Sequence, residues 1–289
     1  VTPEVGRPFK QFEIDSIPSD IKLTSNGRYF LVSSIATNKI YVIDAVSGKF
    51  IKEIKVGKMP VSIAIADRIF KVFVANKGDS TISVIDLKKM EVTDTVKVCE
   101  SPAGLSLIEN QEEVIFYDTI TNKVFSMKLS GDYYNSYTTT CIANAPNISK
   151  VLKQNGLLYV LSRSTNNLSI FNPDSKVPVK VIQTGSKPVD IAIVKNKIYV
   201  VNAGDDTLSV FNATNYENIK TIELETNAFP RNFNVLDANN TAIITNANGY
   251  EALVYDIQQD KIIKRLPLSI PVGMVVISNK LKQNANERL

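Results

Sequence analysis

Short apolar runs of five to eight residues recur along most of the chain and are separated by polar turns. After Pro60, for example, they cover Val61–Ile65, Lys71–Asn76, Thr81–Asp86 and Glu91–Val98. The runs are rich in Val, Ile, Tyr and Phe, whereas Gly, Asn, Asp and Ser occupy the joints, a combination typical of strands and hairpins. Since no long segment places apolar residues at helical spacing, the sequence predicts an all-β protein.

The four runs of one unit differ in their polarity. The second run is almost continuously apolar, as at Val72–Ala75 and Ile198–Val201, which is typical of a strand covered on both faces. The third run alternates more, as at Ile40–Asp44. The fourth carries charges such as Lys52 and Glu53, which suit an outer edge that must not pair with other chains. This gradient predicts the four-stranded blade of a β-propeller.

Seven prolines divide the chain into units of nearly constant length. They are separated by 42, 42, 44, 42, 42 and 41 residues: Pro18, Pro60, Pro102, Pro146, Pro188, Pro230 and Pro271. Such a period is the sequence signature of a repeat architecture. Because repeat proteins of this length form one continuous array, we expect residues 1–289 to form a single propeller domain.

Two segments carry a family resemblance. Residues 71–86 read KVFVANKGDSTISVID and residues 197–212 read KIYVVNAGDDTLSVFN, and the element Gly-x-x-Pro recurs at 57–60 and 185–188. These segments resemble the repeat of the YVTN-type β-propellers, and the resemblance extends over about residues 9–278. It implies the fold, but such propellers serve as surface-layer proteins, binding scaffolds and a few enzymes, so it leaves the function open.

The number of blades depends on the two ends of the chain. Six complete repeats lie between Pro18 and Pro271, with a possible outermost strand at Phe9–Asp15 and a possible innermost strand at Val272–Ser278. In a six-bladed ring, the last strand would compete with the first inner strand for one place. We therefore expect seven blade positions, the seventh abbreviated and closed by both termini, with six blades as the alternative.

Composition excludes several classes of function. The chain has no His, which removes Ser-His-Asp and Cys-His catalysis and imidazole ligation of zinc or haem iron. Its net charge of +4 arises from interspersed charges without a basic stripe, so nucleic-acid binding is not expected. The sequence contains no run of 18 apolar residues, so we expect no membrane span. The N-terminus resembles that of a mature chain whose leader has been removed, and we expect a periplasmic or cell-surface protein.

Two cysteines, Cys99 and Cys141, end the outer strands of neighbouring units. Their expected separation of one blade exceeds the Cα distance of about 4.4–6.8 Å that a disulfide requires, which favours free thiols. The irregular length of the third unit leaves a disulfide open.

The centre of the ring is the place where we expect a ligand, because inner strands from all blades meet there. The residues two positions after each proline are Asp20, Ser62, Gly104, Ile148, Asp190, Asn232 and Gly273. Those four positions after are Lys22, Ala64, Ser106, Lys150, Ala192, Asn234 and Val275. Oxygen atoms of Asp20, Asp190, Asn232 and Asn234 could hold a divalent cation such as Ca²⁺ or Mg²⁺. Alternatively, Lys22 and Lys150 neutralise the two aspartates in a structural polar plug, with no cofactor.

These features favour a non-enzymatic binding or assembly platform of the cell envelope, in which loops contact a partner protein or a surface polymer. Tyr133, Tyr134 and Tyr137 lie together in the irregular third unit, either as partner anchors or as packing for an abnormal outer strand. The alternative function is a lactonase-like metal-dependent hydrolase, in which water bound to the axial cation acts without His.

Overall fold

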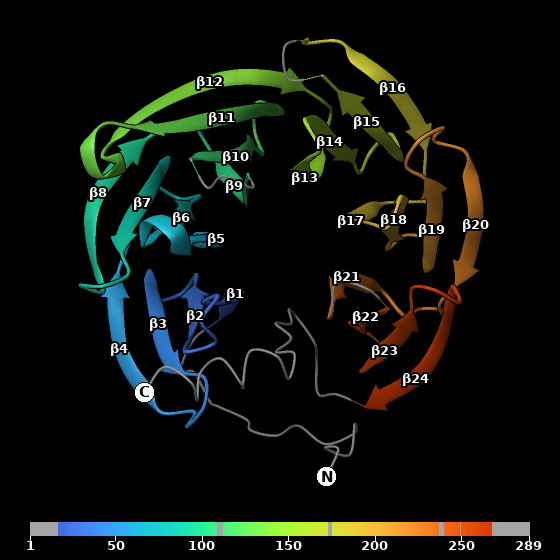
Figure 1. Cartoon of the computed structure of the whole chain (residues 1–289), viewed down its shortest axis with the longest axis horizontal. Helices are drawn as coiled ribbons and strands as arrows, with labels where there is room; N and C mark the ends of the chain where they lie inside the picture. The colour runs from blue at the N-terminus through green and yellow to red at the C-terminus, as the bar shows by residue number, and fades with distance from the viewer. Residues whose placement is uncertain (1–16, 109–111, 173–174, 237–239, 249, 268–289) are drawn as a thin grey trace.

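Six four-stranded antiparallel sheets surround a common axis (Figure 1). The computed structural model describes residues 17–108, 112–172, 175–236, 240–248 and 250–267. In each sheet the four strands follow one another in sequence from the axis to the rim. The chain is therefore an all-β protein with a β-propeller fold, as predicted.

Each sheet uses one repeat unit. The first three sheets are formed by β1 (Pro18–Leu23), β2 (Tyr29–Ser34), β3 (Lys39–Asp44) and β4 (Phe50–Lys55); β5 (Pro60–Ala66), β6 (Lys71–Asn76), β7 (Thr81–Asp86) and β8 (Glu91–Lys97); and β9 (Pro102–Leu107), β10 (Glu113–Asp118), β11 (Lys123–Ser130) and β12 (Ser136–Asn144). The last three are formed by β13 (Ile148–Gln154), β14 (Leu157–Ser162), β15 (Asn167–Phe171) and β16 (Pro178–Gln183); β17 (Pro188–Val194), β18 (Lys197–Asn202), β19 (Thr207–Asn212) and β20 (Asn218–Glu223); and β21 (Pro230–Val235), β22 (Thr241–Asn246), β23 (Glu251–Asp256) and β24 (Lys261–Pro267). Two short 3₁₀ helices, η1 (Asp67–Ile69) and η2 (Asp132–Tyr134), interrupt the turns. Within the described ranges, no helix is long and apolar enough to cross a membrane.

The predicted number of seven blades is wrong, because the described residues form six sheets with 24 strands. A four-stranded sheet needs four runs, and outside the six repeats the sequence offers only one apolar run at each end. Those two runs, Phe9–Asp15 and Val272–Ser278, lie outside the described residues, as does Pro271.

Burial decreases from the second strand of a sheet to its outer strand. The second strands β6 and β18 are buried along almost their whole length, and the outer strands β4 and β20 are mostly exposed, as expected. Among the third strands, the four central residues of β7 and of β19 are all buried, so these two strands are covered on both faces. Strands β3 and β11 are buried less continuously.

Successive sheets are joined by apolar cores. Five clusters connect the six sheets in sequence order, and each cluster contains residues of two adjacent sheets. Between the first two sheets, Leu31 packs with Val72 and Val74. Between the fifth and sixth, Tyr199 stacks on Phe233 with ring centroids 4.9 Å apart. The strands of one sheet thus bury their apolar faces only against the sheets beside it.

A register shift near the start of each inner strand corrects the predicted alignment of the fourth unit. The shift follows the first strand residue at Pro18, Pro60, Pro188 and Pro230, but in β13 it follows Ile148. Because the third unit is two residues longer, Pro146 precedes β13 by two positions. Lys150, and not Ile148, therefore occupies the position of Asp20 and Asp190.

We expect Gly57→Ala to lower the free energy of unfolding by about 1–3 kcal/mol, because its Cβ would overlap with side chains that pack against this turn. That Cβ would lie 2.6 Å from Cγ of Asn76 and 2.6 Å from Oδ2 of Asp79. Urea unfolding measures the change. In an Asn76→Ser background, which copies the serine of the equivalent position Ser34, the loss should be smaller. An equal loss in both backgrounds would contradict this explanation.

Candidate functional site

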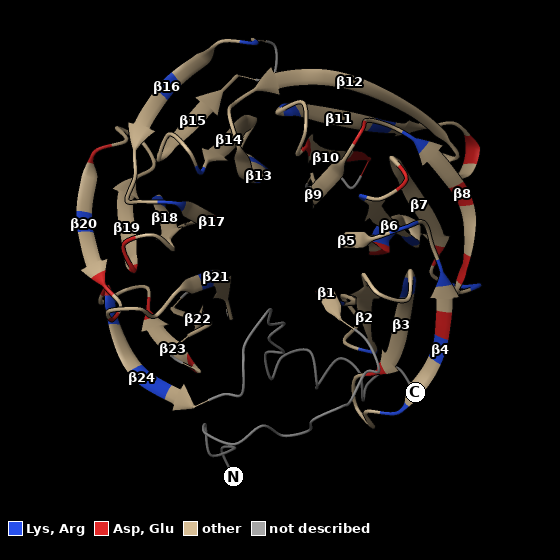
Figure 2. Ribbon diagram, turned by 180° about the vertical axis from the view of Figure 1, so that it is seen from behind, with Lys and Arg blue, Asp and Glu red and all other residues tan. Residues whose placement is uncertain are grey.

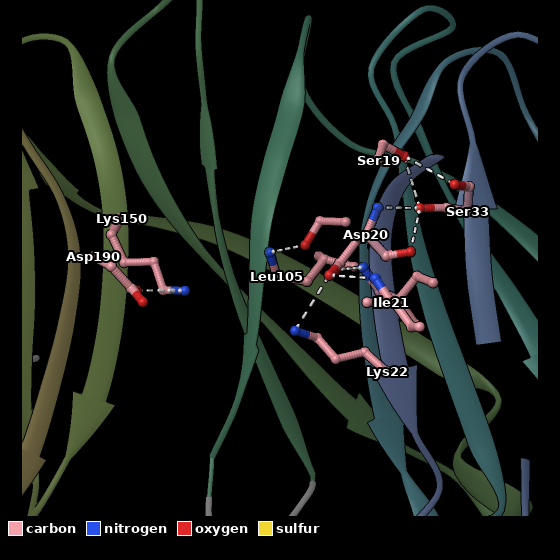
Figure 3. Close-up of polar contacts among 10 residues, drawn as sticks. Ser19, Asp20, Ile21, Lys22, Ser33, Leu105, Lys150 and Asp190 are labelled. Atoms are coloured by element: carbon pink, nitrogen blue, oxygen red, sulfur yellow. Dashed lines mark hydrogen bonds and ion pairs between the residues drawn. The ribbon is translucent and has the colours of Figure 1, made fainter. Parts of the chain in front are cut away.

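Side chains at the start of the inner strands connect neighbouring sheets around the axis. Oδ2 of Asp20 accepts a hydrogen bond from the backbone N–H of Ile63 in the next sheet, at 2.8 Å. Oδ2 of Asp190 accepts one from Phe233 in the same way, at 2.9 Å. In the second sheet, Oγ of Ser62 accepts the N–H of Leu105 at 3.0 Å (Figure 3). An acceptor two residues into the inner strand thus binds the following inner strand.

Two lysines neutralise the two carboxylates. Nζ of Lys22 lies 3.4 Å from Oδ1 of Asp20, and Nζ of Lys150 lies 3.0 Å from Oδ1 of Asp190. Asp20 and Lys22 both belong to β1, whereas Lys150 in β13 and Asp190 in β17 join two inner strands, and Figure 3 shows the two pairs apart. The negative charges of Asp190 and, more weakly, of Asp20 raise the pKa of Lys150 against the effect of burial. The lysine is therefore a permanent cation at the axis, with 41% of its side chain exposed.

Three of the four predicted oxygen ligands of a cation already have other partners in the structure. Each aspartate already contacts a backbone N–H and a lysine, and Oδ1 of Asn232 accepts a long hydrogen bond of 3.4 Å from Thr245. Asn234 presents a buried Nδ2, a donor, which has no partner among the described residues. The described ranges also contain no group of three or more His, Cys, Asp or Glu that could hold a metal ion. Of these six candidate residues, Asp20, Lys22, Lys150 and Asp190 form two ion pairs, and Asn232 and Asn234 belong to neither.

A second ring of contacts lies at the end where the inner strands begin. Four residues directly before an inner strand have a left-handed backbone, with φ between 47° and 53°: Met59, Asn147, Lys187 and Phe229. Their N–H groups each donate to a side-chain oxygen of the preceding sheet, at 2.8–2.9 Å: Asn38, Asn122, Asn166 and Asp206. Each acceptor directly precedes a third strand and is itself left-handed. The sequence signal, an Asn or Asp before the third run, recurs in four of the six units.

We call the four residues Met59, Asn147, Lys187 and Phe229 the entry face. Met59 is 43% exposed, Asn147 and Lys187 are exposed, and Phe229 is half-buried beneath the guanidinium of Arg231, 5.3 Å from the ring centroid. The face thus combines apolar, amide and cationic groups on a backbone held by hydrogen bonds. Sequence reasoning did not identify these residues, because their shared property is a backbone angle.

The three tyrosines of the third unit lie at the opposite end, with Tyr133 and Tyr134 in η2 and Tyr137 near the start of β12. Oη of Tyr137 donates to Oδ2 of Asp94 in the neighbouring sheet at 3.0 Å, and both Tyr137 and Tyr134 pack against the core between these sheets. Tyr133, in contrast, is 89% exposed and left-handed at φ 65°. Two of the three predicted anchors therefore pack the outer strand, and one is displayed.

Both cysteines are free thiols. Burial, together with the carboxylate of Asp118, raises the pKa of Cys99 to about 12. Although burial opposes it, the N–H groups of Thr121 and Ile120 and the thiol of Cys99 lower the pKa of Asp118. This aspartate also accepts the N–H of Glu100, so it closes the connection before the third sheet.

Solved structures of similar shape have several different roles. No protein-family profile matches the chain, and no curated protein matches its sequence. A catalytically inactive virginiamycin B lyase from Staphylococcus aureus with quinupristin is 15% identical, with a TM-score of 0.76, over 91% of this chain and 89% of that one. The β-propeller domain of Cps50 (Swd1) from Myceliophteria thermophila is 9% identical, with a TM-score of 0.74, over 89% of each.

A third similar structure is the dihydro-heme d1 dehydrogenase NirN in complex with DHE, which is 14% identical with a TM-score of 0.71. The alignment covers 88% of this chain but 57% of NirN, so the chain spans little more than half of that protein. At these identities the likeness establishes the β-propeller fold and nothing about activity.

Substitution of Asp190 separates its two contacts. Asp190→Ala leaves the buried N–H of Phe233 without an acceptor and should lower the free energy of unfolding by about 2 kcal/mol. Asp190→Asn keeps an acceptor and loses only the ion pair with the 41% exposed Lys150, which is screened and contributes about 1 kcal/mol or less. Chemical denaturation of both variants measures the difference. Equal losses would show that the hydrogen bond to Phe233 is not the main contribution.

Alkylation of Cys99 should be unusually slow below pH 10. With a pKa of about 12, the thiolate is on the order of one part in a thousand at pH 9. In a Cys141→Ser background, the rate with iodoacetamide, followed by mass spectrometry, should rise about tenfold per pH unit up to pH 11. The same protein in urea is the control, and its rate should level off above about pH 9.5. A plateau near that pH in the folded protein would contradict the raised pKa.

Proposed function

We propose that this chain is a non-enzymatic binding platform of the cell envelope, whose entry face binds a partner protein or a surface polymer. The observation that carries the proposal is the left-handed backbone of Met59, Asn147, Lys187 and Phe229. For Met59, Lys187 and Phe229 this conformation costs about 1–2 kcal/mol each, whereas Asn adopts it more readily. Such strain persists where the surroundings enforce it and is concentrated at functional sites.

The entry face has the properties of a rigid docking surface. Hydrogen bonds from the preceding sheets fix its backbone before any partner arrives, which reduces the entropy lost on binding. Met59 and Phe229 offer apolar area, while Lys187 and Arg231 offer charge. Tyr133, at the opposite end, is available for a second contact.

The hydrolase alternative has less support, because the carboxylates it requires are engaged by backbone N–H groups and lysines. A metal ion bound by these carboxylates would have to displace the ammonium groups of Lys22 and Lys150. The proposed place in the periplasm or at the cell surface rests on the likeness of residues 71–86 and 197–212 to YVTN repeats.

The test is capture of partners from the envelope fraction of the native source by immobilised protein. We expect a retained protein or polymer to be lost, by at least about tenfold in amount, with the double variant Met59→Ser, Phe229→Ser. Phe70→Ser is a matched control, because Phe70 is also left-handed and 47% exposed but precedes β6, at the other end of the ring.

Equal retention by wild type and the double variant would contradict a role for the entry face. Loss of retention with Tyr133→Ser alone would move the partner site to the opposite end.

A further inference from the structure

Strand β12 differs from the other five outer strands in length and charge. It has 9 residues, whereas the others have 6 or 7. It is also the one outer strand of the six described sheets without Lys, Arg, Asp or Glu, and in Figure 2 it is uniformly tan. Charged side chains on an edge strand prevent pairing with other chains. This protection is missing from β12.

The free edge of β12 can be assigned to particular residues. The N–H of Leu129 in β11 donates to the carbonyl of Glu112, on the side of β10, so Leu129 does not bond its partner Tyr137 in β12. Because hydrogen-bonded and non-bonded pairs alternate in an antiparallel ladder, the N–H and C=O groups of Tyr137, Thr139 and Cys141 point outward. Figure 1 shows β12 on the rim, with no described strand beyond it.

We propose that a second copy of this chain pairs with this edge, joining two rings through antiparallel β12 strands. The two-fold axis passes at Thr139, so that Thr139 faces Thr139 of the other copy and Tyr137 faces Cys141. This register forms about six N–H···O=C bonds, because every outward group from 137 to 141 finds a partner. The result is one sheet of eight strands shared by two molecules.

Charge and side-chain chemistry favour a copy of the same chain. Residues near a two-fold axis meet their own kind, so a charge there would face a like charge, and β12 has none. Its exposed side chains Ser136, Thr138 and Thr140 form a row of hydroxyls, and Thr–Thr pairs across strands are favourable. Strand β4 offers a comparison. The backbone N–H of Val56 donates to Asn38, so Ile54 also bonds toward β3 and the backbone N–H of Glu53 points outward. In a two-fold pairing centred there, Glu53 would face Glu53 of the other copy.

The experiment is sedimentation equilibrium of the purified chain over a range of concentrations. We expect a reversible dimer, and Thr139→Pro should raise its dissociation constant at least about tenfold, because two edge hydrogen bonds are lost. Proline removes an N–H that the ring does not use, so the ladder to β11 remains. The matched control is Thr221→Pro in β20, whose N–H also points outward and which should dimerise like wild type. Thermal unfolding followed by circular dichroism verifies that both variants fold.

A cysteine at the axis provides a second measurement. In the Cys141→Ser background, Thr139→Cys should form an interchain disulfide on oxidation, since directly opposed residues have Cα atoms about 5.5 Å apart. Thr221→Cys should not. Wild-type protein that sediments as a monomer throughout, or two proline variants with the same affinity, overturns the proposal. If the chain is a monomer, the remaining candidate to pair with the β12 edge is a strand of another protein.

Discussion

The hydrogen bond from one inner strand to the next is the constraint on which the ring depends. Each inner strand is the edge of its own sheet, and an edge strand carries N–H groups that its sheet does not use. The side chains of Asp20, Ser62 and Asp190 accept these hydrogen bonds. Their donors are the backbone N–H groups of Ile63, Leu105 and Phe233, respectively. A buried donor without a partner costs about 1–3 kcal/mol, so these contacts also fix how far each sheet can slide against its neighbour.

Contacts from one sheet to the next also fix the backbone at the end of the ring where the inner strands begin. Asn38 and Asp206 also reach from one sheet to the connection that begins the next, and hold Met59 and Phe229 in a conformation they would not adopt alone. Among the described residues, each unit from the second to the sixth thus receives such a contact from the unit before it. The apolar clusters add most of the buried area, but they do not select a single backbone angle, whereas a side-chain oxygen at 2.8–2.9 Å does.

Much of the fold could be predicted from the sequence, because the proline period and the apolar runs reflect strands directly. The bounds of β6, β7, β18 and β19 agree with the runs residue by residue. The number of blades could not be predicted, since it depends on chain ends with too few runs. Lys150 was placed wrongly, because a two-residue insertion moved Pro146 away from the strand start. The entry face was not predicted, since a left-handed backbone at Met59 or Phe229 leaves no trace in residue type.

The absence of histidine has a consequence for how the turns respond to acid. Asp44, Asp86 and Asp118 close turns by accepting backbone N–H groups, and these hydrogen bonds hold their pKa values below the usual range, for Asp86 and Asp118 despite burial. No side chain of the sequence has an ordinary pKa between 5 and 8. Burial raises the pKa of Asp67 above its usual range, in contrast to these three aspartates. The turns that Asp44, Asp86 and Asp118 close therefore keep charged, hydrogen-bonded carboxylates in mildly acidic surroundings.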